Sequence, residues 1–172
     1  MSEKVIFDTN FFTYFSDNQG SFAFVPDDST DTLEDRFDFL MENLEKSLSQ
    51  VIIPAAVLAE VLAAKNSNEE AILKIISDQS NIIFSEFDKR QSIEFGYLFK
   101  NYSREEENRN SFKFDMLILA CAKIEGVRTI YTADDGLKRK AQRMGMRAIN
   151  FQELDRPTPP ATPATDTMDL FD

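Results

Sequence analysis

Four acidic residues near the ends of predicted strands or the starts of predicted helices are the best candidates for chemistry in this sequence. Asp8 follows the short apolar run 5–7, which is typical of a buried strand. Asp134 directly follows another predicted strand. Asp115 precedes an apolar helix, and Glu60 lies about one turn into a different helix. We expect the four carboxylates to meet in one site.

Carboxylates that meet in one site repel one another unless something compensates them. At about 4 Å, each ionised pair costs roughly 1 kcal/mol in water-like surroundings and about 4 kcal/mol at an effective dielectric constant near 20. Either some carboxylates stay protonated, or a hard divalent cation binds. The chain has no histidine and one cysteine, so the ligands would be oxygens, which favour Mg²⁺ or Mn²⁺ over Zn²⁺. Such a metal supports hydrolysis of a phosphodiester by activating water and neutralising charge.

Each acidic position also has a simpler interpretation when it is taken alone. The polar residues 8–10 suit a turn or a helix cap. Glu60 lies among apolar neighbours, where a carboxylate needs a partner or access to water. It would then be exposed or paired with a cation. The metal-site hypothesis depends on all four acids occurring together.

Alternating strands and helices must position these acids. The alternation predicts an α/β fold of three layers, α/β/α, with a central mainly parallel sheet. In such sheets ligands bind at the carboxyl ends of the strands. The predicted strands lie near 5–7, 51–53, 81–85, 129–132 and 147–151. The predicted helices lie near 11–15, 31–49, 54–65, 69–79, 88–102, 115–125 and 136–144.

Local signals suggest where two of these helices begin and end. Asp31 with Glu34 resembles a capping box, and the helix that follows should run to about Ser49. Asp115 is expected at the head of its helix, and Gly126 should end that helix. The charged segment before Asp115 is then a connection between helices.

Length and composition indicate one domain at 1–154 followed by a disordered, acidic, Pro/Thr-rich tail at 155–172. The last residues of the tail are either a short docking peptide or passive. No apolar run approaches the roughly 20 residues of a membrane span. The N-terminus lacks the pattern of a signal peptide. We therefore expect a cytoplasmic protein with no membrane partner, and a single cysteine excludes an intrachain disulfide.

The net charge of -11 argues against passive binding of a polyanion. The charge is uneven, however: residues 1–50 are mostly acidic, whereas residues 104–147 carry more basic than acidic residues. This second region could contact a nucleic-acid backbone, or it could simply be a solvated surface. The candidate backbone contacts are Lys113, Lys138, Arg139 and Arg143.

Four segments in this order resemble the PIN-domain family, including its VapC-type toxins. They are VIFDTN (5–10), PAAVLAEVL (54–62), KFDMLILACA (113–122) and IYTADDGLKR (130–139). The resemblance implies an α/β/α fold, an acidic Mg²⁺ or Mn²⁺ site and ribonuclease activity. Many bacterial members are toxins that a cognate antitoxin neutralises, and members are often dimers. An antitoxin or other protein partner and a homodimer are therefore expectations for this chain.

The resemblance also implies roles for individual acids. Asp8 and Asp134 would bind the metal, and Asp115 would complete its coordination. Glu60 would bind the metal directly or through water. Asp135 would be a further ligand or the cap of the following basic helix.

The resemblance includes two polar residues, and the sequence departs from the family pattern in two regions. Asn10 and Thr132 match positions that orient the site. The acidic region 17–38 and the tail are departures, and they bear on the toxin assignment more than on the fold. The main hypothesis is a Mg²⁺- or Mn²⁺-dependent endoribonuclease. The alternative is a non-catalytic PIN-like module that binds RNA or protein.

Overall fold

A parallel sheet forms the centre of the molecule. The computed structural model describes residues 3–17, 22–65, 67–78, 80–104 and 107–157. Within these residues the strands are β1 (Lys4–Phe7), β2 (Gln50–Pro54), β3 (Ile82–Ser85), β4 (Thr129–Tyr131) and β5 (Arg147–Ile149). Their order is β3-β2-β1-β4-β5, and every neighbouring pair is parallel. The predicted α/β class and parallel sheet are confirmed.

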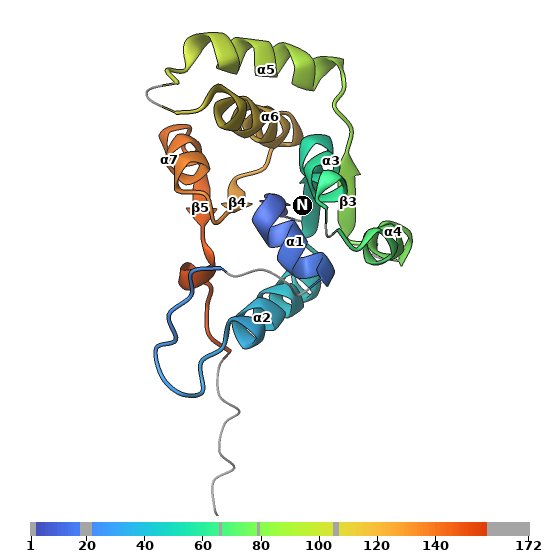
Figure 1. Cartoon of the computed structure of the whole chain (residues 1–172), viewed down its shortest axis with the longest axis vertical. Helices are drawn as coiled ribbons and strands as arrows, with labels where there is room; N and C mark the ends of the chain where they lie inside the picture. The colour runs from blue at the N-terminus through green and yellow to red at the C-terminus, as the bar shows by residue number, and fades with distance from the viewer. Residues whose placement is uncertain (1–2, 18–21, 66, 79, 105–106, 158–172) are drawn as a thin grey trace, which may run out of the picture.

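Helices flank the sheet. In the described residues they are α1 (Thr9–Asp17), α2 (Leu33–Lys46), α3 (Ala55–Ala63), α4 (Glu69–Asp78), α5 (Lys89–Asn101), α6 (Arg109–Glu125) and α7 (Asp135–Arg143), followed by the 3₁₀ turn η1 (Phe151–Glu153). Figure 1 shows α5 and α6 packed side by side, with α7 beside β5 and α4 beside β3. None of the helices in these ranges is long and apolar enough to cross a membrane.

The core explains why the strands are short continuous apolar runs. β1 is the central strand, and its last three residues are buried on both faces of the sheet. Beside it, Phe11 of α1 stacks on Phe151 with ring centroids 4.0 Å apart, and Phe11 also contacts Tyr131 of β4. This aromatic cluster fixes α1 against the carboxyl end of the sheet.

Helix α2 differs from the prediction at both ends. Thr32, not Asp31, is the N-cap, and its hydroxyl accepts the N–H of Asp35 at 3.0 Å. Asp31 is instead buried against the guanidinium of Arg36, with Oδ2 2.6 Å from Nη2. The helix ends at Lys46 rather than near Ser49. The capping pattern fits two adjacent residues, and a buried ion pair decided between them.

Helix α6 begins earlier than predicted. Asn108 caps it by accepting the N–H of Asn110 at 2.8 Å, and the helix runs from Arg109 to Glu125. Asp115 therefore lies about two turns inside the helix and not at its head. Part of the charged segment 103–111, predicted as a connection, is the first turn of this helix. Gly126 ends it as predicted, with φ of 71°.

The division into a domain at 1–154 and a tail from 155 stays a prediction. Residues 158–172 of the predicted tail lie outside the described residues. At the start of the tail, Arg156 pairs with Asp28 at 2.8 Å. The tail's first residues are therefore held against the loop before α2.

Candidate functional site

A cavity of about 310 Å³ opens at the carboxyl ends of the central strands. It adjoins the point between β1 and β4 where the strand order reverses, which is where open α/β sheets bind ligands. The pairing of Phe7 with Tyr131 sets Asp8 level with Thr132. Four acids from four separate segments line the cavity: Asp8, Glu60, Asp115 and Asp134. The sheet thus brings together the four acids predicted from the sequence.

Asp8 lies at the floor of the site. Its side chain is buried, and its Oδ1 accepts the N–H of Phe11 at 2.9 Å. Burial raises the pKa of Asp8 to about 6, although hydrogen bonds from Phe11 and from the hydroxyl of Thr132 oppose this rise; the charge of Asp134 adds to it. Asp8 is therefore a carboxylate whose negative charge the protein does not fully compensate.

Asp115 faces a cation supplied by α7. The ammonium of Lys140 donates a hydrogen bond to Asp115 Oδ2 at 2.8 Å and also pairs with Glu107. Lys140 and Asp115 are both buried. Burial raises the pKa of Asp115 to about 6 despite the opposing effect of Lys140. Burial lowers the pKa of Lys140, but its bonds to Asp115 and Glu107 more than offset this and raise it above its ordinary value.

Asp134 and Glu60 lie at the more exposed rim. Asp134 is the N-cap of α7, and its Oδ1 accepts the N–H groups of Gly136 at 2.6 Å and Leu137 at 2.9 Å. Its own N–H donates to Thr132 Oγ1 at 2.9 Å. Glu60 is exposed, and the hydroxyl of Thr9 donates to it. Glu60 is thus an exposed acid, one of the two simpler interpretations of this position.

The four carboxylates share the cavity without converging on one point. Among the described residues, no three Asp, Glu, Cys or His side chains are grouped closely enough to bind one ion. The expected crowding to about 4 Å is therefore not present in this arrangement. The physical reason is local: each acid is turned to a donor of its own. Coordination of one ion by three of them requires side chains to turn, most obviously Asp115 away from Lys140.

Comparison with known proteins decides the family. A family model described as PIN domain matches residues 5–143, which is most of the chain. The chain belongs to the PIN-domain family. No curated protein matches its sequence.

Solved structures resemble this PIN domain in fold. A VapBC2 complex from Rickettsia felis, bound to a DNA fragment from its promoter, aligns with a TM-score of 0.58 and 19% identity over 86% of this chain and 98% of that one. DNA-bound VapBC from Salmonella typhimurium aligns with a TM-score of 0.54 and 18% identity over 87% of this chain and 98% of that one. Mycobacterium tuberculosis VapC20, a toxin that cleaves the sarcin–ricin loop, aligns with a TM-score of 0.52 and 13% identity over 79% of this chain and 94% of that one. At these identities the likeness concerns the fold alone.

The supporting residues of the PIN domain lie unevenly around the site. Thr132 is fully buried and bridges Asp8 and Asp134 through its hydroxyl, so its position suits the predicted orienting role. Asn10 lines the cavity. Asp135 is exposed in the first turn of α7 and is not among the described residues that line the cavity. The cap of α7 is Asp134, so the alternative role suggested for Asp135 belongs to its neighbour.

The four candidate backbone contacts do not form one surface. Arg139 and Arg143 line a second cavity of about 390 Å³, together with Arg104, and Asp134 lies on its border with the acidic cavity. Lys138 points elsewhere and pairs with Glu153. Lys113 lines a third cavity, between α5 and α6. Arg104 was not among the residues selected from the sequence.

The polar partners of the acids were not predicted from the sequence. Thr9 donates to Glu60, and Lys140 donates to Asp115. A signal for Lys140 was present: Leu137 and Ala141 are the buried apolar residues of α7, and Lys140 is three residues after Leu137, on the same helix face. A lysine on the inward face of an amphipathic helix requires an acidic partner, and the structure supplies Asp115 and Glu107.

Proposed function

We propose that this PIN domain is a metal-dependent endoribonuclease that hydrolyses RNA phosphodiester bonds at the acidic cavity. The single observation that supports this most strongly is that Asp8, Glu60, Asp115 and Asp134 come from four separate segments and line one cavity. A domain with no catalytic or metal-binding role has no need to keep mutually repelling carboxylates at a strand switch point.

The donor set fits Mg²⁺ or Mn²⁺. All four acids offer oxygen ligands, and the raised pKa values of Asp8 and Asp115 indicate negative charge that a cation would stabilise. We propose Asp8, Asp115 and Asp134 as ligands, with Glu60 binding directly or through water. A bound ion would activate water and neutralise charge on the phosphate. Asp135 is left out of this set because it lies away from the cavity.

The residues of the chain have separate tasks in this proposal. Thr132 holds Asp8 and Asp134 in register through one hydroxyl. The N–H groups that Asp134 accepts fix one of its oxygens and leave Oδ2 for a ligand. Arg139 and Arg143, in the adjoining cavity, would bind a phosphate next to the one attacked. These cations allow a strongly acidic protein to bind RNA locally.

The test is cleavage of 5′-labelled RNA with Mg²⁺ or Mn²⁺ and with a chelator. Wild type should cleave only with metal, and the products should carry no 2′,3′-cyclic phosphate because water, and not the 2′-hydroxyl, is the nucleophile. Asp8→Asn and Asp115→Asn should lower cleavage at least about 100-fold with the fold retained. Asp135→Asn is the matched control on the cavity's outside and should keep activity. Full activity in both cavity variants would end the proposal.

The second candidate is a PIN domain that binds RNA or protein without cutting. Two observations favour it. Lys140 already pairs with Asp115, and no three acids among the described residues are grouped closely enough to bind one ion. Undiminished RNA binding together with no cleavage at millimolar Mn²⁺ would support this candidate.

We further propose a cytoplasmic toxin–antitoxin role with a protein antitoxin as partner. The support is the likeness in fold to VapBC complexes and to the VapC20 toxin. Co-purification with the product of a neighbouring small reading frame, and relief of growth arrest by that product, would test it. The expected homodimer stays a prediction, which sedimentation of the purified chain can check.

A further inference from the structure

A third cavity, between α5 and α6, combines aromatic rings with positive charge. It measures about 400 Å³ and is lined by Phe95 and Phe99 of α5 and by Arg109, Asn110 and Lys113 of α6. The two rings are 5.4 Å apart, and Phe99 packs in turn on Phe112. Phe95 and Phe99 are only partly buried. The rings therefore form a supported apolar wall that reaches solvent.

The charge of this cavity is unusual for the protein. Its described lining contains two cations and no acid, although the whole chain carries a net charge of -11. Neither Arg109 nor Lys113 has an ion pair within the described residues, whereas lysines elsewhere, such as Lys123 and Lys138, are paired with glutamates. Such a cavity suits an anion that carries an apolar, planar group.

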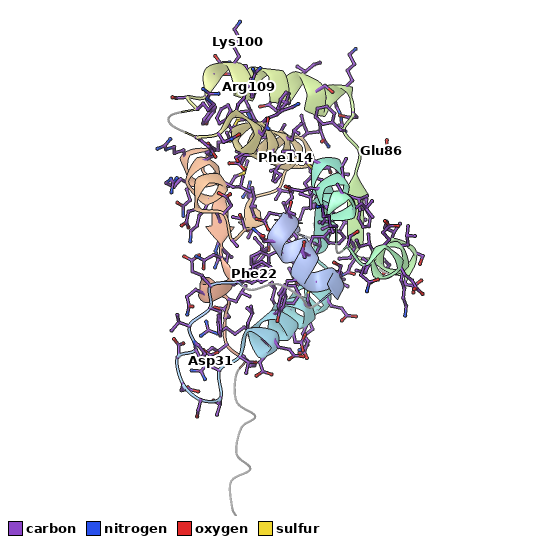
Figure 2. The ribbon with its side chains drawn as sticks, viewed as in Figure 1. Phe22, Asp31, Glu86, Lys100, Arg109 and Phe114 are labelled. Carbon is purple, nitrogen blue, oxygen red and sulfur yellow. The ribbon has the colours of Figure 1, made fainter. Side chains whose placement is uncertain are left out.

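The cavity adjoins the acidic one on the same helix. Asn110 lines both, and Ser111, Phe114 and Asp115 continue along α6 into the acidic cavity. Figure 2 labels Arg109 where α6 lies beneath α5, and Phe114 farther along α6. Asn110 and Asp115 are separated by five residues, or roughly 7.5 Å of helix rise. An RNA strand bound at the acidic cavity would therefore place in this cavity a base that is about one or two nucleotides from the phosphate at the acids.

We propose that the α5–α6 cavity binds one unpaired nucleobase of the RNA substrate beside the cleaved bond. Phe95 and Phe99 stack on the base, while Arg109 and Lys113 contact the flanking phosphates. The inference rests on the proposed function, because that function supplies RNA as the ligand. A base without its phosphates would give Arg109 and Lys113 no partner. It assigns position-dependent recognition to side chains that lie outside the acidic cavity.

The test measures RNA affinity, without cleavage, and asks whether the effect of one ring depends on one base. Short single-stranded RNAs, each with one abasic position, are titrated against protein with Mg²⁺ present and with Asp8→Asn in every variant to keep the RNA intact. At one position, loss of the base should weaken binding at least about fivefold. Phe95→Leu should weaken binding of the complete RNA by a similar factor and abolish the effect of the abasic position. Arg109→Ala should weaken binding to all RNAs and reduce its salt dependence.

The control is Tyr97→Leu, an exposed aromatic on the same helix but outside the described lining of the cavity. It should leave both affinities unchanged. Arg109→Ala alters an exposed side chain, so it tests the cavity even if Phe95→Leu unfolds. The inference is wrong if no position couples to Phe95, or if Tyr97→Leu gives the same result. Coupling without any cleavage by the wild-type protein would contradict the proposed function, while the binding of a base in this cavity would still be supported.

Discussion

Lys140 Nζ lies 2.8 Å from Asp115 Oδ2 inside the acidic site, with both side chains buried. The same ammonium pairs with Glu107 and lies 5.7 Å from the centre of the Phe112 ring. Lys140 therefore supplies positive charge at a carboxylate proposed to bind metal. A metal ion and this ammonium compete for one oxygen, so the pair sets how readily the site accepts a cation.

Removing the ammonium of Lys140 should show how much free energy it costs to bury the Asp115 carboxylate without a partner. Lys140→Met leaves Asp115 buried without its partner, which should lower the metal-free unfolding free energy by about 3 kcal/mol. Mn²⁺ should then stabilise the variant more than it stabilises the wild type, because less positive charge opposes binding. Urea unfolding with and without Mn²⁺ measures both effects. Lys138→Met, whose pair with Glu153 is nearer the surface, is the control and should cost at most about 1 kcal/mol. Equal losses in the two variants would contradict this role of Lys140.

Stability should fall as pH rises through the range in which the buried acids ionise. The folded-state pKa of both Asp8 and Asp115 is raised from 3.8 to about 6, so between pH 4 and 6 the folded state binds more protons than the unfolded state. The stability that these two groups contribute is thus full below about pH 4 and decreases as pH rises, by on the order of 3 kcal/mol for each group. Acids with lowered pKa, such as Asp31 at about 2, lose their contribution only at lower pH.

Metal-free urea unfolding from pH 4 to pH 7 measures this slope. Asp8→Asn should remove about half of it, because one of the two ionising groups is gone. Saturating Mn²⁺ should flatten the wild-type slope, since the ion binds the charged carboxylates. An unfolding free energy that increases across this range in wild type would show that the two acids are not held in the protonated form.

Gly136 leaves space that the cap of α7 requires. A Cβ at this position would lie 2.9 Å from Asp134 Oδ1 and 3.3 Å from Glu107 Oε1. Gly136→Ala should displace the Asp134 carboxylate, cost about 1 kcal/mol of stability through the lost cap, and reduce RNA cleavage. Thermal unfolding and a cleavage assay check the two effects. Gly96→Ala, in α5 with nothing within 4 Å of the new Cβ, should instead stabilise by about 0.5–1 kcal/mol and leave cleavage unchanged.

Arg36 joins the loop before α2 to the end of the domain. Its guanidinium pairs with buried Asp31 and donates to the carbonyl oxygens of Gln152 at 3.1 Å and Leu154 at 2.9 Å. Arg36→Met removes these bonds and leaves Asp31 buried without its main partner, so we expect a loss of about 3–5 kcal/mol in urea unfolding. Arg36→Lys should recover only part of it, because an ammonium cannot reproduce the fork of the guanidinium. Full recovery by lysine would show that charge alone matters here.

The sequence predicted the parts of the fold that depend on local pattern. β1 and β4 are apolar runs followed by polar residues, and parallel strands must end at one edge, so the meeting of Asp8 with Asp134 was predictable. Gly126 ended α6 as expected because a positive φ favours glycine.

What the sequence did not predict depends on tertiary contacts. The competition between Thr32 and Asp31 for the start of α2 was decided by Arg36, which needs Asp31 in the core. The charged first turn of α6 resembled a loop, yet Phe112 within it is buried and draws that turn into the helix. The turning of each acid to its own donor depends on tertiary packing: the pattern of α7 places Lys140 on the buried face, but it does not select Asp115 as its partner.

The most direct test of the central claim is calorimetric titration of metal-free protein with Mn²⁺ at neutral pH. If the cavity acids form a metal site, the wild type should bind at micromolar to millimolar Mn²⁺. Asp8→Asn and Asp115→Asn should each weaken binding by at least about tenfold while the far-UV spectrum stays unchanged. Asp135→Asn should bind like the wild type, because that side chain lies outside the cavity. Absence of binding to the wild type at millimolar Mn²⁺, or equal binding by all four proteins, would contradict the account.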